Sequence, residues 1–127
     1  NLRAKIQNPE DERAKMALER EAAKPLRAPV LIAVSVSPDR AGKAIEVEEI
    51  RAGGAATMNI LYAAHAMGLA AFWRTGDAAY NDRVKQWLGL KPDDHIIAFV
   101  YVGYPDMEPP KQEREPASAK TEWRGWE

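Results

Sequence analysis

Four consecutive residues, Trp73-Arg74-Thr75-Gly76, have the side chains and the backbone freedom that a ligand-binding turn needs. They close the apolar run 69–73, which is typical of a short buried strand. In an α/β sheet, ligands bind beyond the carboxyl ends of the strands, where backbone N–H groups have left the ladder. Gly76 lets the chain approach a flat ligand, and Trp73 and Arg74 could border an aromatic ring or pair with a phosphate. The same residues also fit an ordinary turn without a ligand, which is the commoner case.

Motifs for other kinds of chemistry are missing from the sequence. His65 and His95 are far apart and no HExxH motif is present, so we expect both to be structural and predict no metal site. No serine sits in a GxSxG elbow, and "RAGGAA" lacks the spacing of a phosphate-binding loop. We therefore name no catalytic side chain, and the turn is the candidate site.

Composition restricts the class of protein. The chain has 127 residues, 46% hydrophobic and 29% charged, which suits one domain over 1–127. Its formal net charge is -1, so we expect no nucleic-acid partner and no attraction to anionic lipid. It has no cysteine, and no apolar run approaches the ~20 residues that span a membrane. The charged first segment is unlike a secretory signal, so we expect a cytoplasmic protein.

The turn needs a scaffold, and helices alternate with strands along the chain. Residues 8–24 predict a helix that begins with Asn8 and Pro9 and is stopped by Pro25. Residues 29–36 are β-branched and almost uncharged, which predicts a strand buried on both faces.

The longest predicted element is a helix over 47–67. Gly53 and Gly54 each cost it about 1 kcal/mol relative to alanine, which indicates either close approach of another segment on that side or a helix that begins after the two glycines. Gly68 is placed to end the helix. The three-and-four spacing predicts that one packed face consists of Ala56, Asn59, Ile60, Ala63 and Met67.

After the strand over 69–73, residues 80–90 predict a short helix, and 95–104 predict a third buried strand. In the short helix, Val84, Trp87 and Leu88 are expected to point inward. The alternation of strands and helices predicts an α/β (α+β) fold.

Residues 105–127 differ from the rest in composition. They hold prolines, many charges and two tryptophans, Trp123 and Trp126, and cannot form a central strand or a long helix. They suit either a disordered tail or an extended arm that docks on a surface.

Longer motifs resemble one known family. "AGGAATMNILYAAHAMGLAAFWRTG" resembles the long helix and the WxxG turn of the FMN-dependent nitroreductases, most closely the small bacterial NAD(P)H nitroreductases. "VKQWLGLKPDDHIIAFVYVGYP" resembles the segment in which a family helix ends in LGLP and a strand returns to GYP. "LRAPVLIAVSV" is similar to the family's APxxIxV strand. The similarity runs from about residue 10 to 105.

The resemblance implies FMN at the interface of a homodimer. Trp73, Arg74, Thr75 and Gly76 would lie along the isoalloxazine, and an amide of Thr75 or Gly76 would hydrogen-bond flavin N5. NAD(P)H would reduce the flavin, and a small organic acceptor such as a nitro compound or a quinone would take the electrons in a ping-pong cycle.

The resemblance also implies an intertwined dimer built on a mixed sheet flanked by helices. The central helix and 105–127, a proline-rich C-terminal arm, would hold the two subunits together, with Trp123 and Trp126 as anchors. Arg124 is a further candidate for a phosphate contact.

One part of the family pattern has no counterpart. The family's opening helix carries an Arg-Arg-Ser-type motif that clamps the FMN phosphate, whereas residues 1–10 contain Arg3 and Lys5 but no such cluster. The chain thus resembles a family member without its N-terminal part. The alternative is a non-catalytic α/β interaction module, or a flavin-binding remnant, whose arm docks on a partner.

Overall fold

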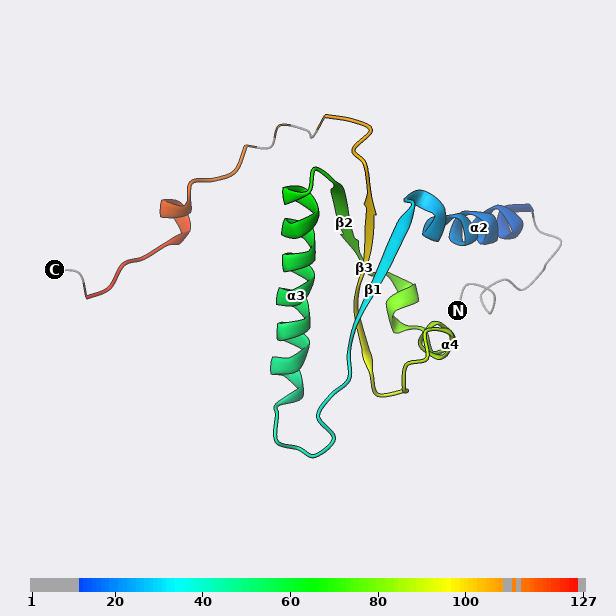
Figure 1. Cartoon of the computed structure of the whole chain (residues 1–127), viewed down its shortest axis with the longest axis horizontal. Coiled ribbons are helices and arrows are strands. Elements are labelled where there is room, and N and C mark those ends of the chain that lie inside the picture. Colours follow the sequence, from blue (N-terminus) through cyan, green and yellow to red (C-terminus); the bar gives the residue numbers. More distant parts are fainter. Residues whose placement is uncertain (1–11, 109–110, 112, 126–127) are drawn as a thin grey trace.

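The fold is a three-stranded sheet with a long helix on one side, seen in a computed structural model that describes residues 12–108, 111 and 113–125 (Figure 1). The helices are α2 (Glu12–Ala23), α3 (Glu46–Ala66) and α4 (Asp82–Trp87), and the strands are β1 (Val30–Val36), β2 (Ala70–Arg74) and β3 (His95–Gly103). Short 3-10 helices are η1 (Lys24–Arg27), η2 (Asp77–Tyr80) and η3 (Ala117–Lys120). The predicted elements are confirmed in order; the start assigned to Asn8 and Pro9 lies outside the described residues.

The sheet has the order β1-β3-β2, and β3 is antiparallel to both neighbours. Val100, in the middle of β3, pairs with Ile32 on one side and with Trp73 on the other. Since β1 and β2 both oppose β3, they run in the same direction, and α3 connects them. This arrangement is the α+β form of the predicted fold class.

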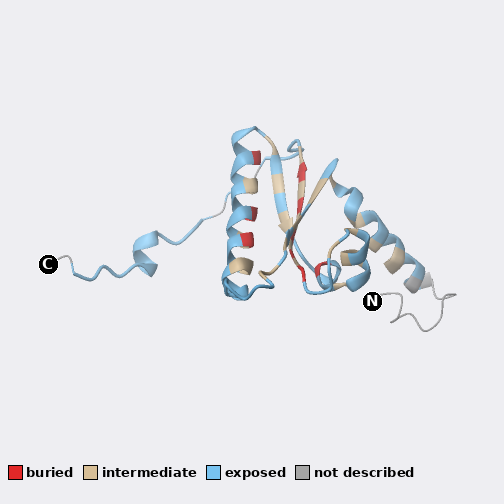
Figure 2. Cartoon of the chain, turned by 60° about the horizontal axis from the view of Figure 1, so that its bottom comes forward, coloured by how far each residue is buried: buried red, intermediate tan, exposed pale blue. Residues whose placement is uncertain are grey.

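The core lies between α3 and the sheet. Figure 2 shows the buried residues on the side of α3 that faces the strands and along β3. The central cluster consists of Ala64 from the helix and Ala98, Val100 and Val102 from β3. Burial of this apolar surface is the main force that holds α3 on the sheet.

The predicted packed face of α3 is wrong for four of its five members. Ile60 packs against the core, but Ala56, Asn59, Ala63 and Met67 are exposed. The buried residues of the helix are instead Gly53, Thr57 and Ala64. Both sides of this helix are rich in small or apolar residues, so periodicity alone did not distinguish them.

Close approach at Gly53 explains which side packs. A Cβ at Gly53 would lie 2.5 Å from Cγ2 of Val36 and 3.0 Å from Cγ1 of Ile97. The expectation of close approach at this glycine is therefore confirmed. The end of the helix is also as predicted, because Gly68 has φ +75 and the amide of Leu69 donates to the Ala64 carbonyl at 2.9 Å.

Two burial predictions are corrected. In the described sheet β1 pairs with β3 alone, and each of its residues is either exposed or half-buried, so this strand is not buried on both faces. The side chain of Trp87 is 83% exposed, whereas Val84 and Leu88 are half-buried. Helix α4 has six residues, too few to cover the sheet with all three side chains.

The segment after β3 leaves the body of the protein. It runs away from the sheet beyond α3, and its regular structure in the described part is η3 (Figure 1). Every described residue from Tyr104 to Gly125 is exposed. The described part of this segment is extended, and no other described segment of the chain covers it.

Candidate functional site

The candidate turn begins at the carboxyl end of β2. Trp73 and Arg74 are the last two residues of the strand, paired with Val100 and Phe99 of β3. Thr75 and Gly76 follow outside the ladder. The structure therefore keeps the four predicted residues together at a strand end, and β3 fixes the first two of them.

Trp73 faces the core rather than the solvent. It is half-buried and packs against the cluster between α3 and the sheet. Its Cη2 atom would lie 3.8 Å from a Cβ at Gly54, which is ordinary van der Waals contact. Trp73 thus joins the turn to the long helix.

Arg74 points to the opposite face of the sheet, since successive side chains of a strand alternate. Its guanidinium carbon lies 5.5 Å from the centroid of the Phe72 ring, within the range of a cation–π contact. Arg74 is exposed, and no carboxylate in the described ranges forms an ion pair with it.

Thr75 and Gly76 present their backbone to solvent. Gly76 has φ 81 and ψ -172, a conformation that glycine adopts without strain. Its carbonyl accepts a hydrogen bond from the amide of Ala79 at 3.0 Å, and Ala79 is 2% exposed, so η2 anchors the turn. For the amides of Thr75 and Gly76, no acceptor is found within the described residues.

These features fit the edge of a planar ring that accepts hydrogen bonds. Two adjacent exposed amides are available as hydrogen-bond donors, and a Cβ built at Gly76 meets no atom within 4 Å, so space beside the turn is open. The packing of Trp73 and the anchor at Ala79 hold the backbone in place before any ligand arrives. The turn presents backbone donors toward open space, but it offers no side chain for acid–base chemistry.

A shallow recess lies next to the turn on the face of the sheet away from α3. Its volume is about 190 Å³, and it is lined by Arg27 of η1, Phe72 and Arg74 of β2, and Tyr101 of β3. Arg27 was not predictable from the sequence, because its segment carries no motif and reaches the recess only through the fold.

A network of charges holds the loop between β1 and α3. The guanidinium of Arg40 donates to Asp93 at 2.7 and 2.8 Å and to Asp94 at 3.1 Å. The Asp39 carboxylate accepts a hydrogen bond from the backbone amide of Ala41 at 2.9 Å. The backbone amide of Asp39 in turn donates to the Glu49 carboxylate at 3.0 Å. The network fixes the N-terminal end of α3 and so the helix on which Trp73 rests.

Hydrogen bonds lower the pKa values of three carboxylates in this network. The Lys91 amide, 2.8 Å from the Asp94 carboxylate, lowers the pKa of Asp94, with Ser37 and Arg40 adding to the effect. The amides of Ala41 and Lys43 lower the pKa of Asp39. The Arg40 guanidinium lowers the pKa of Asp93.

The two histidines do not form a site with other candidates. Nε2 of His95 lies 2.6 Å from a carboxylate oxygen of Glu46, and His65 is exposed near the end of α3. Among the described residues, no three His, Cys, Asp or Glu side chains are grouped so that they could hold a metal ion. The described helices include none long and apolar enough to cross a membrane.

Comparison with known families decides the classification. The model of the nitroreductase family matches residues 2–104, which is most of the chain. The chain belongs to the nitroreductase family. It is 31% identical over 84 residues to an Escherichia coli K12 protein named "Putative NAD(P)H nitroreductase YdjA", a match that covers 66% of this chain and 46% of that protein. The chain thus spans less than half the length of this curated relative.

Solved structures of nitroreductases share the fold. A nitroreductase-like protein from Bacillus cereus is 27% identical with a TM-score of 0.71, covering 93% of this chain and 62% of the other. A nitroreductase from Desulfovibrio desulfuricans, solved in complex with FMN, is 30% identical with a TM-score of 0.57, covering 70% and 51%. The predicted family and fold class are confirmed.

Proposed function

We propose that this nitroreductase-family chain is the FMN-binding part of an oxidoreductase that uses NAD(P)H to reduce a small organic acceptor. The observation that carries the proposal is the exposed pair of amides at Thr75 and Gly76, which have no acceptor in the described structure. The FMN complex of a relative that is 30% identical supports the choice of cofactor. The proposal includes a cytoplasmic location.

In this proposal the chain binds and orients, and the cofactor supplies the electron chemistry. Bound FMN would supply hydride transfer from NAD(P)H and two-electron transfer to the acceptor. For a quinone the balance is NAD(P)H plus H⁺ plus quinone giving NAD(P)⁺ plus hydroquinone. An amide of Thr75 or Gly76 would donate a hydrogen bond to flavin N5, and Arg74 would supply positive charge beside the ring.

The rigidity of the turn matters for this role. Trp73 rests on the α3 side of the sheet and Ala79 is buried behind the turn, so the two amides are oriented before the ring binds. Preorganised donors act more strongly than donors that must first be ordered. No proton transfer by a side chain is needed, which agrees with the lack of a catalytic acid or base in the turn.

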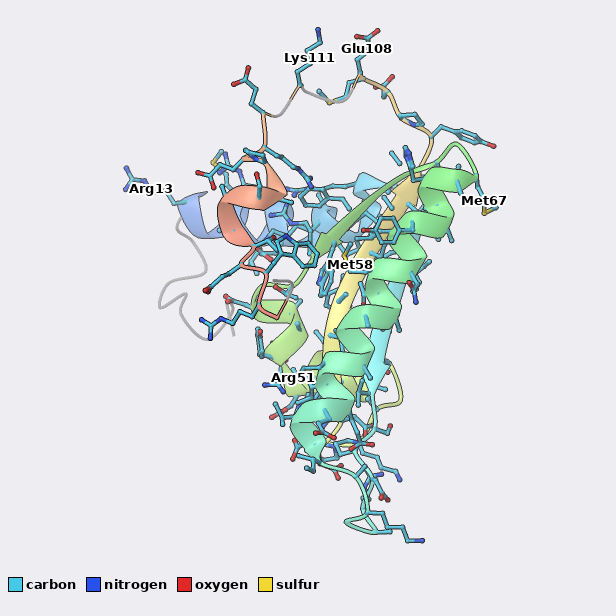
Figure 3. The ribbon with its side chains drawn as sticks, turned by 90° about the vertical axis from the view of Figure 1, so that its left-hand side faces the viewer. Arg13, Arg51, Met58, Met67, Glu108 and Lys111 are labelled. Carbon is cyan, nitrogen blue, oxygen red and sulfur yellow. The ribbon has the colours of Figure 1, made fainter. Side chains whose placement is uncertain are left out.

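We further propose that the active form is a homodimer. The side of α3 away from the sheet carries Met58, which is 38% exposed, and Tyr62, which is 66% exposed; Figure 3 looks onto this side, with Met67 at the end of the helix. Exposed apolar side chains grouped on one helix suit an interface between subunits. The arm 105–127 would extend this contact, with Trp123 and Trp126 as anchors and Arg124 as a candidate phosphate ligand; Trp126 lies outside the described residues.

The cofactor is tested by adding FMN to the purified chain. We expect saturable quenching of flavin fluorescence and, without oxygen, loss of the yellow absorbance when NADH or NADPH is added. Addition of a quinone should then reoxidise the flavin and restore its yellow absorbance. A chain that binds no FMN would contradict the proposal and favour the non-catalytic interaction module.

The dimer is tested by deletion of residues 105–127. Light scattering should give a dimer for the whole chain and a larger monomer fraction after the deletion, at an unchanged circular dichroism spectrum of the body. A monomeric whole chain would refute the dimer. A dimer that persists after the deletion would show that residues 105–127 are not part of the interface.

A further inference from the structure

The recess beside the turn combines two cations with two aromatic rings. Arg27 comes from η1, Phe72 and Arg74 from β2, and Tyr101 from β3. Phe72 and Tyr101 are direct partners in the β2–β3 register, so their rings lie side by side on this face of the sheet. The sheet thus holds the two rings together, and the guanidiniums stand beside them.

Neither guanidinium is neutralised by a carboxylate of the described residues. No ion pair with a carboxylate is found for Arg27 or Arg74 in the part of the chain that the structure describes. Arg74 is held over the Phe72 ring, at 5.5 Å from its centroid. Arginine keeps its charge at all physiological pH values and binds carboxylates and phosphates through paired N–H groups. The recess therefore favours an anion.

The rings favour an aromatic anion. Phe72 is 61% exposed, so its ring offers apolar area that a ligand can cover. A volume of about 190 Å³ is below the roughly 300–1,000 Å³ of pockets that hold drug-sized ligands. One substituted ring fits this space better than a three-ring flavin does.

We infer that the recess binds a small monocyclic aromatic anion, such as an aromatic carboxylate, with its charge on Arg27 and Arg74 and its ring on Phe72 and Tyr101. Because Arg74 directly precedes Thr75, a ligand in the recess lies beside the turn. In the enzyme, a monocyclic aromatic anion that also carries a nitro or quinone group is the electron acceptor and takes two electrons with the accompanying protons, a role that rests on the proposed function. Its binding to the recess does not.

The test measures binding of benzoate to the full chain by calorimetry, without FMN. We expect Arg27→Gln and Arg74→Gln each to weaken benzoate binding about tenfold, because each removes charge-assisted hydrogen bonds. The matched control is Arg83→Gln, which removes the same charge from an exposed residue of α4 that does not line the recess. Urea unfolding of each variant confirms that it is folded.

Three small molecules separate the contributions of the aromatic ring, the negative charge and the type of anion to binding. Acetate lacks the ring, benzyl alcohol lacks the charge and inorganic phosphate is the alternative anion, and all three should bind more weakly than benzoate. Absence of benzoate binding, equal binding of acetate or phosphate, or an equal loss in Arg83→Gln would overturn the inference. If FMN binds and benzoate does not, this inference alone fails; if benzoate binds and FMN does not, the recess stands and the acceptor role falls.

Discussion

Substitution of the adjacent glycines Gly53 and Gly54 of α3 by alanine should change the free energy of unfolding in opposite directions. A Cβ at Gly53 would approach Cγ2 of Val36 to 2.5 Å, whereas a Cβ at Gly54 has its nearest neighbour, Cη2 of Trp73, at 3.8 Å. The first distance is a severe clash with the methyl group of a β-branched side chain on the sheet. The second is normal contact.

The magnitudes follow from these distances. Alanine is favoured over glycine inside a helix by about 1 kcal/mol, and both variants gain this amount. Overpacking a core costs about 1–3 kcal/mol, and only Gly53→Ala incurs that cost. We therefore expect Gly54→Ala to raise the free energy of unfolding by up to about 1 kcal/mol, and Gly53→Ala to lie about 1–3 kcal/mol below it.

Urea unfolding of the full chain measures both values. The slope with urea should be the same for the two variants and the parent, so that the shift in midpoint reports stability. Equal midpoints for Gly53→Ala and Gly54→Ala would refute the close packing of α3 on β1 and β3. A destabilised Gly54→Ala would show that the region around Trp73 is tighter than the structure indicates.

Other predictions concern the charge network and the surface. The pKa values of Asp39, Asp93 and Asp94 are lowered in the folded chain, so their stabilising effect is complete above the unfolded pKa, about 4, and is lost as the pH falls below it. The urea midpoint should therefore drop between about pH 5 and pH 3, and less steeply in Asp94→Asn; a midpoint independent of pH would contradict the network. Trp87 is 83% exposed, and Trp87→Gln should change the free energy of unfolding by no more than about 0.5 kcal/mol, whereas a loss above about 2 kcal/mol would show that this side chain is buried in solution.

The elements of this fold were predictable because their local patterns are strong. The β-branched run of β1, the glycine after α3 and the apolar run of β3 each match an element of the structure to within about two residues. The choice of the packed side of α3 was not predictable. Ala56 and Ala63 on the exposed side are as compatible with burial as Gly53 and Ala64, and the close approach of Val36 decides between them.

The candidate site, too, was predictable in part from the sequence and in part only from the structure. Trp73-Arg74-Thr75-Gly76 was found from the sequence because the four residues are consecutive at a strand end. The separation of Trp73 and Arg74 onto opposite faces follows from strand geometry. The recess could not be predicted, because Arg27, Phe72 and Tyr101 come from three elements and meet only through the register of β2 and β3 and the position of η1.

The most direct measurement is an NMR titration of the ¹⁵N-labelled chain with FMN, following the amide resonances of Thr75 and Gly76. We predict that one of these two amides shows a large downfield shift on saturation, as expected for a new hydrogen bond to the ring, and that AMP, which has the phosphate but no isoalloxazine, leaves both unchanged. If FMN binds while both resonances stay in place, or if AMP moves them equally, the turn does not hold the flavin.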